Sequence, residues 1–171
     1  PTEDVAYSYT VTASDDDGNT LTFSATTLPT WLSFDGTATI SGTPLNEHVG
    51  TQHSVVLTVS DGFGTVAQEF TLTVENVNDL PVFTSTQITA ATEDVAYSYT
   101  VTATDEEDDA LTFAATTLPT WLSFDTNTKV LSGTPLNEHV GTHVVVLTVS
   151  DGFGTVPDSF TITVTNVNDA P

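Results

Sequence analysis

A single stretch that occurs twice decides the fold of this protein: TEDVAYSYTVTA at Thr2–Ala13, repeated without change at Thr92–Ala103. The two copies are 90 residues apart, and the same spacing separates later matches, since Trp31 returns as Trp121. Self-similarity at a fixed long period is the signature of a repeat architecture. The sequence therefore predicts two similar domains in tandem.

The repeat also sets the domain boundaries, which we place at residues 1–79 and 80–171. A length near 90 residues is usual for a small β-sandwich domain. The segment PVFTSTQI at Pro81–Ile88 has no counterpart before the first copy, so we expect the first domain to lack most of its first strand. The chain stops at Asn168–Pro171, where a third copy would begin, and we interpret it as a window from a longer array.

Within each copy, apolar and polar residues alternate. Tyr7, Tyr9 and Val11 share one face of the first such segment, with Ser8 and Thr10 on the other. A period of two is typical of a strand with one buried face, and no window shows a helical period. Similar alternation recurs at residues 21–25, 55–59 and 70–74, with turn residues between the segments. We therefore expect an all-β fold of two tandem Greek-key sandwiches, Ig-like or cadherin-like.

The chain is strongly acidic: it contains 23 acidic residues and one basic residue, and its net charge is −22. Nucleic acid and anionic membrane surfaces would repel such a chain, so neither is an expected partner. No apolar stretch approaches the roughly 20 residues of a membrane span, so we expect no membrane insertion by this segment. The absence of cysteine excludes disulfides and thiolate metal sites.

The acidic residues gather at the turns. If the strand at residues 5–13 runs upward, Asp15, Asp17 and Asp61 lie at the top of the domain, whereas Glu3 and residues 76–79 lie at its bottom. The bottom of the first domain would meet the top of the second. The side chains expected to converge there are Glu3, Asn76, Asn78, Asp79, Asp105, Glu107 and Asp151.

A cluster of this kind needs a cation. Two carboxylates ~5 Å apart near a protein surface repel by roughly 3 kcal/mol, and several such pairs would rival the stability of a whole domain. Calcium takes oxygen ligands from carboxylates, amide side chains and backbone carbonyls, whereas zinc and copper suit this set poorly. The sequence therefore predicts bound Ca²⁺.

Several segments resemble the cadherin repeat. VTASDDDGNTLTF at Val11–Phe23 is similar to its DxD region, LTVSD at Leu57–Asp61 to its late aspartate, and VNDLP at Val77–Pro81 to its linker. LPTWLSFD at Leu28–Asp35 and SGTP at Ser41–Pro44 resemble more closely the bacterial cadherin-like repeats of the dystroglycan type. Those repeats occur in tandem in large secreted and surface proteins.

The resemblance implies a calcium-ligand set in each copy. It comprises an acid at the base of the domain, the DxD pair, the late aspartate and the linker ligands. These would be Glu3, Asp15, Asp17, Asp61, Asn78 and Asp79 in the first copy, and Glu93, Asp105, Glu107, Asp151, Asn168 and Asp169 in the second. The chain departs from the family pattern at Asn76 and Leu80, and PLNEH at Pro44–His48 replaces the DRE motif. We therefore expect one or two ions per junction.

Each of these acidic motifs also has a simpler interpretation. Asp61-Gly62 is a common hairpin pair, and Asp15–Asp17 with the following Gly-Asn is turn chemistry. A generally acidic surface also keeps proteins soluble in high salt. That explanation predicts acids scattered over strand faces, whereas these recur at matching turns in both copies.

Histidines and aromatic residues raise further alternatives. Zinc binding would need a third ligand in each copy besides the two histidines, and none is evident. We therefore interpret the histidines as loop residues: His48, His53, His139 and His143. Trp31 and Trp121 would either stack on sugars or anchor the core, and the apolar residues on both sides favour the core. Phe63 and Phe153, each between glycines, are the better candidates for exposed rings.

Together these patterns predict a calcium-binding extracellular repeat module that rigidifies a multidomain surface or secreted protein and supports adhesion. Its partners would be neighbouring repeats in the same chain, with self-association or polysaccharide binding as further options. The alternative is a carbohydrate-binding module of a secreted polysaccharide-degrading enzyme. Carboxylate pairs suit glycosidases, but no cleft-forming insertion is evident, so we expect no enzyme activity.

Overall fold

The computed structural model describes residues 1–168, which divide into two compact units, residues 1–77 and 78–168. The sequence placed this boundary after residue 79. Each unit consists of β-strands and one short 3₁₀ helix, η1 at Asn46–His48 or η2 at Asn137–His139. No helix within residues 1–168 has the length and apolar character needed to cross a membrane.

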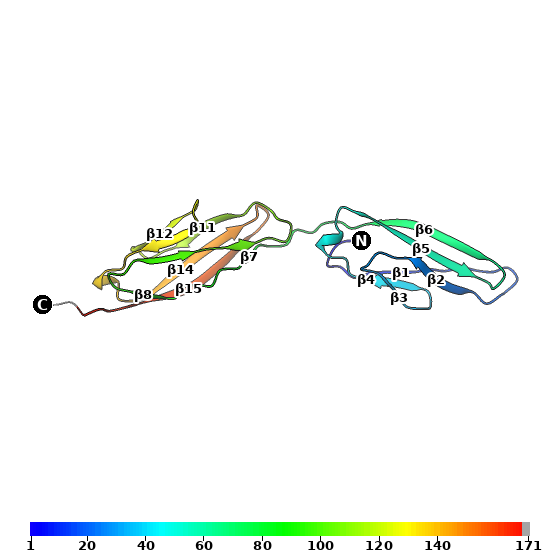
Figure 1. Ribbon diagram of the computed structural model, residues 1–171, viewed down its shortest axis with the longest axis horizontal. Helices are drawn as coiled ribbons and strands as arrows, with labels where there is room; N and C mark the ends of the chain where they lie inside the picture. Colours follow the sequence, from blue (N-terminus) through cyan, green and yellow to red (C-terminus); the bar gives the residue numbers. More distant parts are fainter. Residues whose placement is uncertain (169–171) are drawn as a thin grey trace. The chain divides into compact units, whose positions relative to one another are not determined.

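The first unit is a sandwich of two three-stranded sheets (Figure 1). One sheet has the order β1-β4-β3 and the other the order β2-β5-β6. The strands are β1 (Tyr7–Thr10), β2 (Thr22–Thr27), β3 (Ser33–Phe34), β4 (Thr39–Gly42), β5 (Gln52–Ser60) and β6 (Thr65–Thr73). All pairings between these strands are antiparallel. The predicted all-β sandwich fold is confirmed.

The second unit repeats this plan and adds three short strands. Its main sheets have the orders β12-β13-β9 and β11-β14-β15-β8, and β10 pairs with β7. The strands are β7 (Val82–Phe83), β8 (Ala90–Thr92), β9 (Tyr97–Thr100), β10 (Ala103–Thr104), β11 (Thr112–Thr117), β12 (Leu122–Asp125), β13 (Val130–Gly133), β14 (Gly141–Ser150) and β15 (Thr155–Thr165). The extra strand β7 comes from residues 81–88, which have no counterpart in the first copy, whereas the parallel pairing of β8 is represented in the first unit by the single bridge between Thr2 and Glu75.

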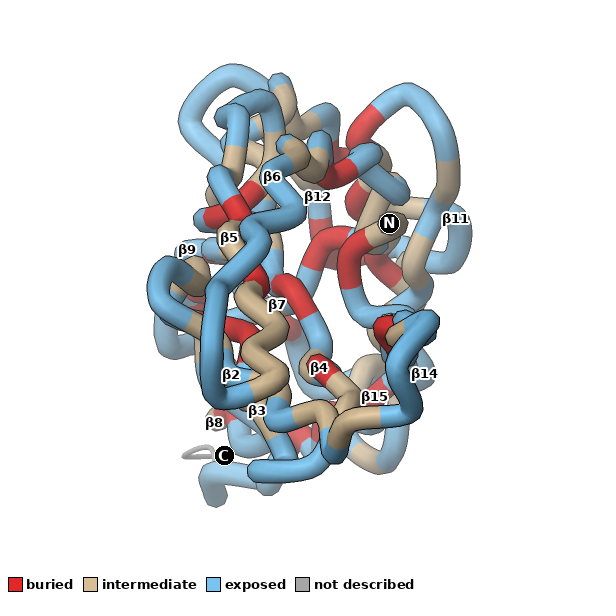
Figure 2. Tube along the Cα trace, turned by 90° about the vertical axis from the view of Figure 1, so that its right-hand side faces the viewer, coloured by how far each residue is buried: buried red, intermediate tan, exposed pale blue. Residues whose placement is uncertain are grey.

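Each core lies between the two main sheets of its unit, where buried and exposed positions alternate along the strands (Figure 2). In the first unit Ile40 of β4 and Leu57 of β5 are completely or nearly completely buried, and in the second Leu131 of β13 and Leu147 of β14 take their places. This is the period of two that the sequence shows, because successive strand side chains point to opposite faces.

Both tryptophans belong to these cores, as predicted. Trp31 and Trp121 are 9% and 8% exposed, and each ring packs edge-on against a tyrosine, Tyr7 of β1 or Tyr97 of β9. Their burial leaves no flat indole surface for stacking on a sugar. By contrast, Phe63 is 90% exposed at the tip of the β5–β6 hairpin, which also agrees with the sequence prediction.

A glycine at the end of one strand in each unit allows the tryptophan segment to approach the sheet. A methyl group at Gly42 of β4 would lie 1.8 Å from the backbone oxygen of Trp31, and at Gly133 of β13 it would lie 1.9 Å from that of Trp121. No side chain fits at these distances, and the obstacle is backbone, which cannot rotate away. Glycine at these two positions is thus a packing requirement.

We expect Gly42→Ala to destabilise the first unit by about 3 kcal/mol through this overpacking. Urea unfolding followed by tryptophan fluorescence would measure the loss, because each unit contains one tryptophan. Gly64→Ala is the matched control, since the nearest atom to its added methyl group is 4.0 Å away. Equal stabilities of the two variants would contradict the packing argument.

Candidate metal centre

Three segments of the second unit place the candidate ligands: the connector at residues 78–79, the loop at residues 105–109 and the β14–β15 hairpin. Asp151 follows β14 and is 6% exposed. Its Oδ1 accepts hydrogen bonds from the N–H groups of Phe153 at 2.8 Å and Gly154 at 2.6 Å, which close the hairpin. Its Oδ2 accepts one from the side-chain amide of Asn78 at 2.9 Å. The connector is thereby attached to the hairpin.

The loop after β10 contributes two more carboxylates. Oδ1 of Asp105 accepts the N–H groups of Glu107 at 3.2 Å and Asp109 at 3.0 Å, which shapes the loop. Oε2 of Glu107 accepts the backbone N–H of Asp79 at 3.3 Å. Asp79 therefore contributes its backbone N–H to this region. The sequence pointed only to its carboxylate.

Several oxygens in this region are buried without a hydrogen-bond partner. They are Oδ1 of Asn78, Oδ2 of Asp105 and Oε1 of Glu107, one from the connector and two from the loop. An unpaired buried polar atom costs about 1–3 kcal/mol, and ionised oxygens cost more. The chemistry of the donor set, amide and carboxylate oxygen without nitrogen or sulfur, fits a hard cation such as Ca²⁺.

No three His, Cys, Asp or Glu side chains in residues 1–168 are gathered closely enough to form a ready-made metal site. The second unit's candidates for holding an ion are the amide oxygen of Asn78 and the carboxylates of Asp105, Glu107 and Asp151, and these carboxylates would have to move closer together to share one. The first unit contributes Glu3 and Asn76 of the expected junction set, and their convergence with these residues stays a prediction.

The corresponding loops of the first unit bring Asp15 and Asp61 to one hollow, which both side chains line. Asp15 accepts the N–H groups of Asp17 and Asn19, and Asp61 accepts those of Phe63 and Gly64, all at 2.7–3.1 Å. The Oδ1 atoms of Asp15 and Asp61 therefore stabilise turns, as the simpler interpretation of both motifs predicts. Asp17 itself is exposed.

A buried glutamate holds the backbone that follows the last strand of each unit. Glu3 is 1% exposed and accepts the N–H of Val77 at 2.5 Å, while Glu93 is 1% exposed and accepts the N–H of Val167 at 3.1 Å. In each glutamate the second carboxylate oxygen is buried without a hydrogen-bond partner. Like Asp105 and Glu107, each of these glutamates has one carboxylate oxygen that accepts a hydrogen bond and one that has no hydrogen-bond partner.

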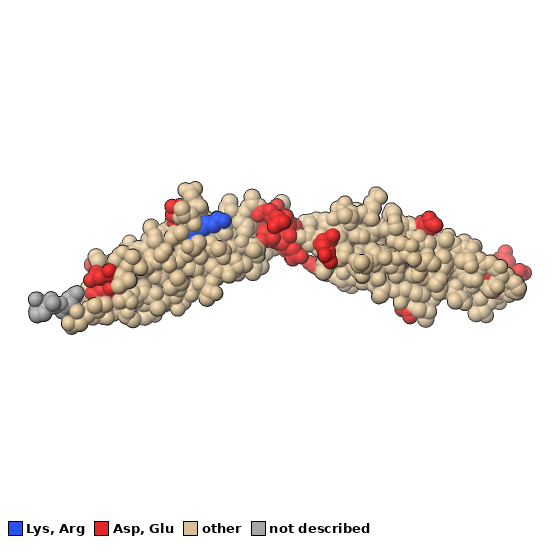
Figure 3. All heavy atoms as spheres, in the orientation of Figure 1, with Lys and Arg blue, Asp and Glu red and all other residues tan. Residues whose placement is uncertain are grey.

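The remaining predicted ligands lie near the ends of the units. Asn76 and Asn168 are exposed. Asp169 lies outside the described residues. On the face drawn in Figure 3 the acidic side chains occupy separate places on a largely uncharged surface, with Lys129 as the one blue side chain.

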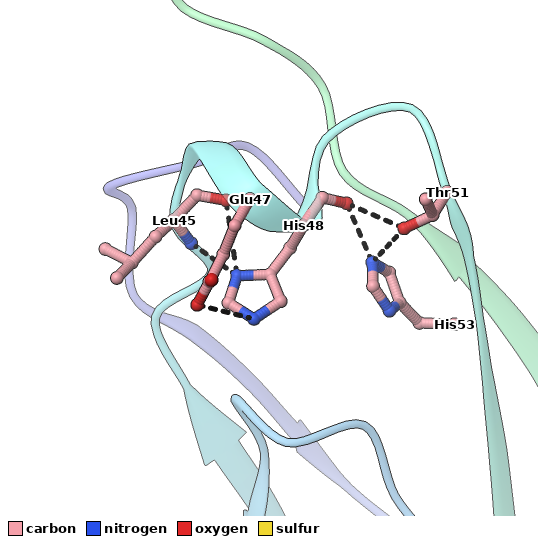
Figure 4. Close-up of polar contacts among 5 residues, drawn as sticks. All are labelled: Leu45, Glu47, His48, Thr51 and His53. Carbon is pink, nitrogen blue, oxygen red and sulfur yellow. Dashed lines mark hydrogen bonds and ion pairs between the residues drawn. The ribbon is translucent and has the colours of Figure 1, made fainter. Parts of the chain in front are cut away.

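The histidines stabilise a loop in each unit, and Figure 4 shows that of the first unit. Nδ1 of His48 accepts the N–H of Leu45 at 2.9 Å, and Nε2 of His53 donates to the backbone oxygen of His48 at 2.7 Å. His139 and His143 repeat both bonds in the second unit. The repetition shows that these imidazoles close the turn around the 3₁₀ helix, a role that the spacing of the histidines does not reveal.

The pKa of Asp151 is lowered, first by the hydrogen bond from Asn78 and then by the N–H groups of Gly154 and Phe153. The pKa of Asp61 is lowered by the equivalent N–H groups of Gly64 and Phe63. A lowered folded-state pKa contributes stability that is present above the unfolded value near 3.9 and is lost as the pH falls through the folded value.

We expect Asn78→Ala to raise the pKa of Asp151, because the amide donor is lost while the two backbone donors remain. Carboxyl-carbon NMR titration of the calcium-free protein would measure both groups in one sample. Asp61 is the internal control and should titrate as before. An unchanged Asp151 would show that Asn78 does not stabilise its charge.

Comparison with known proteins agrees with this architecture. The chain is 31% identical over 149 residues to the serine-rich adhesin for platelets of Staphylococcus aureus strain MRSA252, covering 84% of this chain and 10% of the adhesin. The chain thus spans about a tenth of that relative's length.

A solved structure gives the same fold. Domains EC1-2 of human protocadherin-24 align with a TM-score of 0.52 and 19% identity, over 93% of this chain and 88% of that one. An endo-fucoidan hydrolase of glycoside hydrolase family 107 aligns at 0.48 and 29%, over 98% of this chain and 27% of the hydrolase chain. The Putative Ig domain family matches residues 1–75 and 80–165, so the chain belongs to that family, with one family domain in each unit.

Proposed function

We propose that the chain is a calcium-binding Ig-like repeat of an extracellular or surface protein, of the bacterial cadherin-like type, with a structural role in adhesion. The observation that carries the proposal is the set of buried, unpartnered oxygens on Asp105, on Glu107 and on Asn78, whose amide bonds to the carboxylate of Asp151. The adhesin relative supports the surface location and the adhesive context. The role includes no catalytic step.

Calcium, when bound, supplies the positive charge that the side chains of this region lack. Asp105, Glu107, Asp151 and Asn78 would hold it. The connector already touches the second unit through Asn78 to Asp151 and Asp79 to Glu107. An ion shared by these residues would tie residues 78–79 to that unit more firmly, which is how such a repeat would limit the motion of its connector.

Calcium titration of chelator-treated protein by calorimetry tests the proposal. We expect binding in the range of about 10⁻⁴–10⁻³ M that is typical of extracellular modules. A calcium concentration ten times the dissociation constant would add roughly 1.4 kcal/mol of stability, measured as a rise in Tm. Absence of both heat and thermal shift would refute calcium binding.

Asp105→Asn and Asp151→Asn should each weaken calcium binding in the second unit at least tenfold, because each removes a charged oxygen from the proposed ligand set. Glu138→Gln is the matched control, since it removes one charge from the same unit at an exposed side chain beside His139. Equal losses in all three variants would show a diffuse charge effect in place of a site.

A second candidate function is carbohydrate binding, and the exposed rings of Phe63 and Phe153 favour it. The two rings occupy the same hairpin tip in each repeat, 90% and 77% exposed, where either would stack on a sugar face. Retention on insoluble polysaccharide that is lost in Phe63→Ala and Phe153→Ala would support this function. Retention unchanged by both substitutions would remove these rings from any such role.

A further inference from the structure

Four aspartates of the chain are followed directly by glycine: Asp17, Asp35, Asp61 and Asp151. An Asp-Gly pair rearranges without an enzyme when the glycine nitrogen reaches the aspartate carboxyl carbon, because glycine has no side chain to hinder the approach. All four glycines have positive φ, between 76° and 97°, and a methyl group added to any of them would lie in open space. The glycines therefore do not distinguish the four pairs, and their carboxylates decide which pair reacts.

Hydrogen bonds fix three of these carboxylates. That of Asp35 accepts four, at 2.7–3.0 Å, from the backbone N–H groups of residues 37–39 and from the hydroxyl of Thr37. Those of Asp61 and Asp151 accept the two and three hydrogen bonds described above. Ring closure rotates the carboxyl group about its Cα–Cβ and Cβ–Cγ bonds. At these three positions it would first have to break the hydrogen bonds.

The same hydrogen bonds keep the three groups ionised. They lower the pKa of each group, and the strongest donor is the Thr37 hydroxyl for Asp35, the Gly64 N–H for Asp61 and the Asn78 amide for Asp151. Ring closure expels the hydroxyl of a neutral carboxyl group, and an ionised carboxylate has no such leaving group. These pairs are therefore protected by both geometry and charge.

Asp17 lacks this protection. Its side chain is exposed, and within residues 1–168 no hydrogen bond to its carboxylate is found. The loop is held instead by Asp15, whose Oδ1 accepts the N–H of Asp17 and whose backbone oxygen accepts the N–H of Gly18 at 3.2 Å. The N–H of Gly62 has an equally long bond, to the Ser60 hydroxyl. The free carboxyl group is thus what sets Asp17 apart.

We propose that Asp17-Gly18 is a self-modification site, at which the folded protein converts Asp17 to isoaspartate. The Gly18 nitrogen forms a bond to Cγ of Asp17, the bond from Cγ to its hydroxyl breaks, and that hydroxyl leaves with the amide proton as water. The product is a succinimide ring. Water then opens the ring at the former backbone carbonyl, so that the main chain passes through Cγ. One water leaves and one enters, and nothing is oxidised or reduced.

The change would loosen one loop of the first unit. Isoaspartate adds a carbon to the main chain and displaces the residues that follow, among them Asn19, whose N–H donates to Oδ1 of Asp15 at 2.9 Å. The second unit has Glu107-Asp108 at the matching place. A glutamate would have to close a larger ring, and the side chain of Asp108 hinders the attacking nitrogen. Only the first of these two loops would therefore change with age, whether or not calcium is bound.

Prolonged incubation of the full chain in chelator at neutral pH tests the site. Part of the sample is kept native and part is unfolded in guanidinium, and electron-transfer fragmentation of peptides then locates isoaspartate. In the native sample we expect isoaspartate to form at least tenfold faster at Asp17 than at Asp35, Asp61 or Asp151. In guanidinium all four should react at similar rates, because the hydrogen bonds are gone.

Two further measurements test the chemistry and its consequence. In heavy-oxygen water the isoaspartate should carry one heavy oxygen, and Asp17→Glu should abolish the product at this position. Amide NMR of the aged protein should show a shifted Asn19 N–H and an unchanged Asp109 N–H, which makes the equivalent bond in the second unit.

Three results would overturn the proposal. They are equal native rates at the four pairs, no isoaspartate at Asp17 after its formation at another pair, and an equally large lead of Asp17 in guanidinium. The last result would assign the selectivity to local sequence in place of the fold.

Discussion

The structure depends on how carboxylates are stabilised in a chain that has almost no internal positive charge. Within residues 1–168, carboxylates approach imidazole nitrogens where Glu47 meets His48 and Glu138 meets His139, both at 3.7 Å. Asp15, Asp61, Asp105 and Asp151 instead accept backbone N–H groups from the turns that they begin. Each carboxylate organises its own loop, and the oxygens left over are the ones that an external cation would satisfy.

The repeat makes each unit a control for the other. Features that recur, such as the glutamate that holds the backbone after the last strand, are properties of the domain itself. Features that differ, such as the burial of Tyr7 and Tyr97, follow from residues 81–88 of the second unit, where Ile88 accepts the hydroxyl of Tyr97. Burial raises the pKa of Tyr97 to about 12, which shows how strongly identical residues respond to their surroundings.

The fold could be predicted from the sequence because alternation and turn residues act locally. Tyr7 and Tyr9, the tryptophans and the exposed phenylalanines lie where their neighbours in sequence indicate. The candidate site was harder to predict, because its bonds join positions far apart in the chain. The bonds from Asn78 to Asp151 and from Val77 to Glu3 each span more than 70 residues, and nothing in either motif specifies its partner. Sequence likewise gave no sign that Asp79 would act through its backbone.

Lys129 is the one basic side chain, and it lies between β12 and β13 with its amine 4.6 Å from the centre of the Phe113 ring. A protease that cleaves after lysine or arginine therefore meets a single susceptible bond in these 171 residues, at the tip of one hairpin. Cutting there would leave the first unit in one piece. Against a protease of this specificity, such a composition is itself a form of protection.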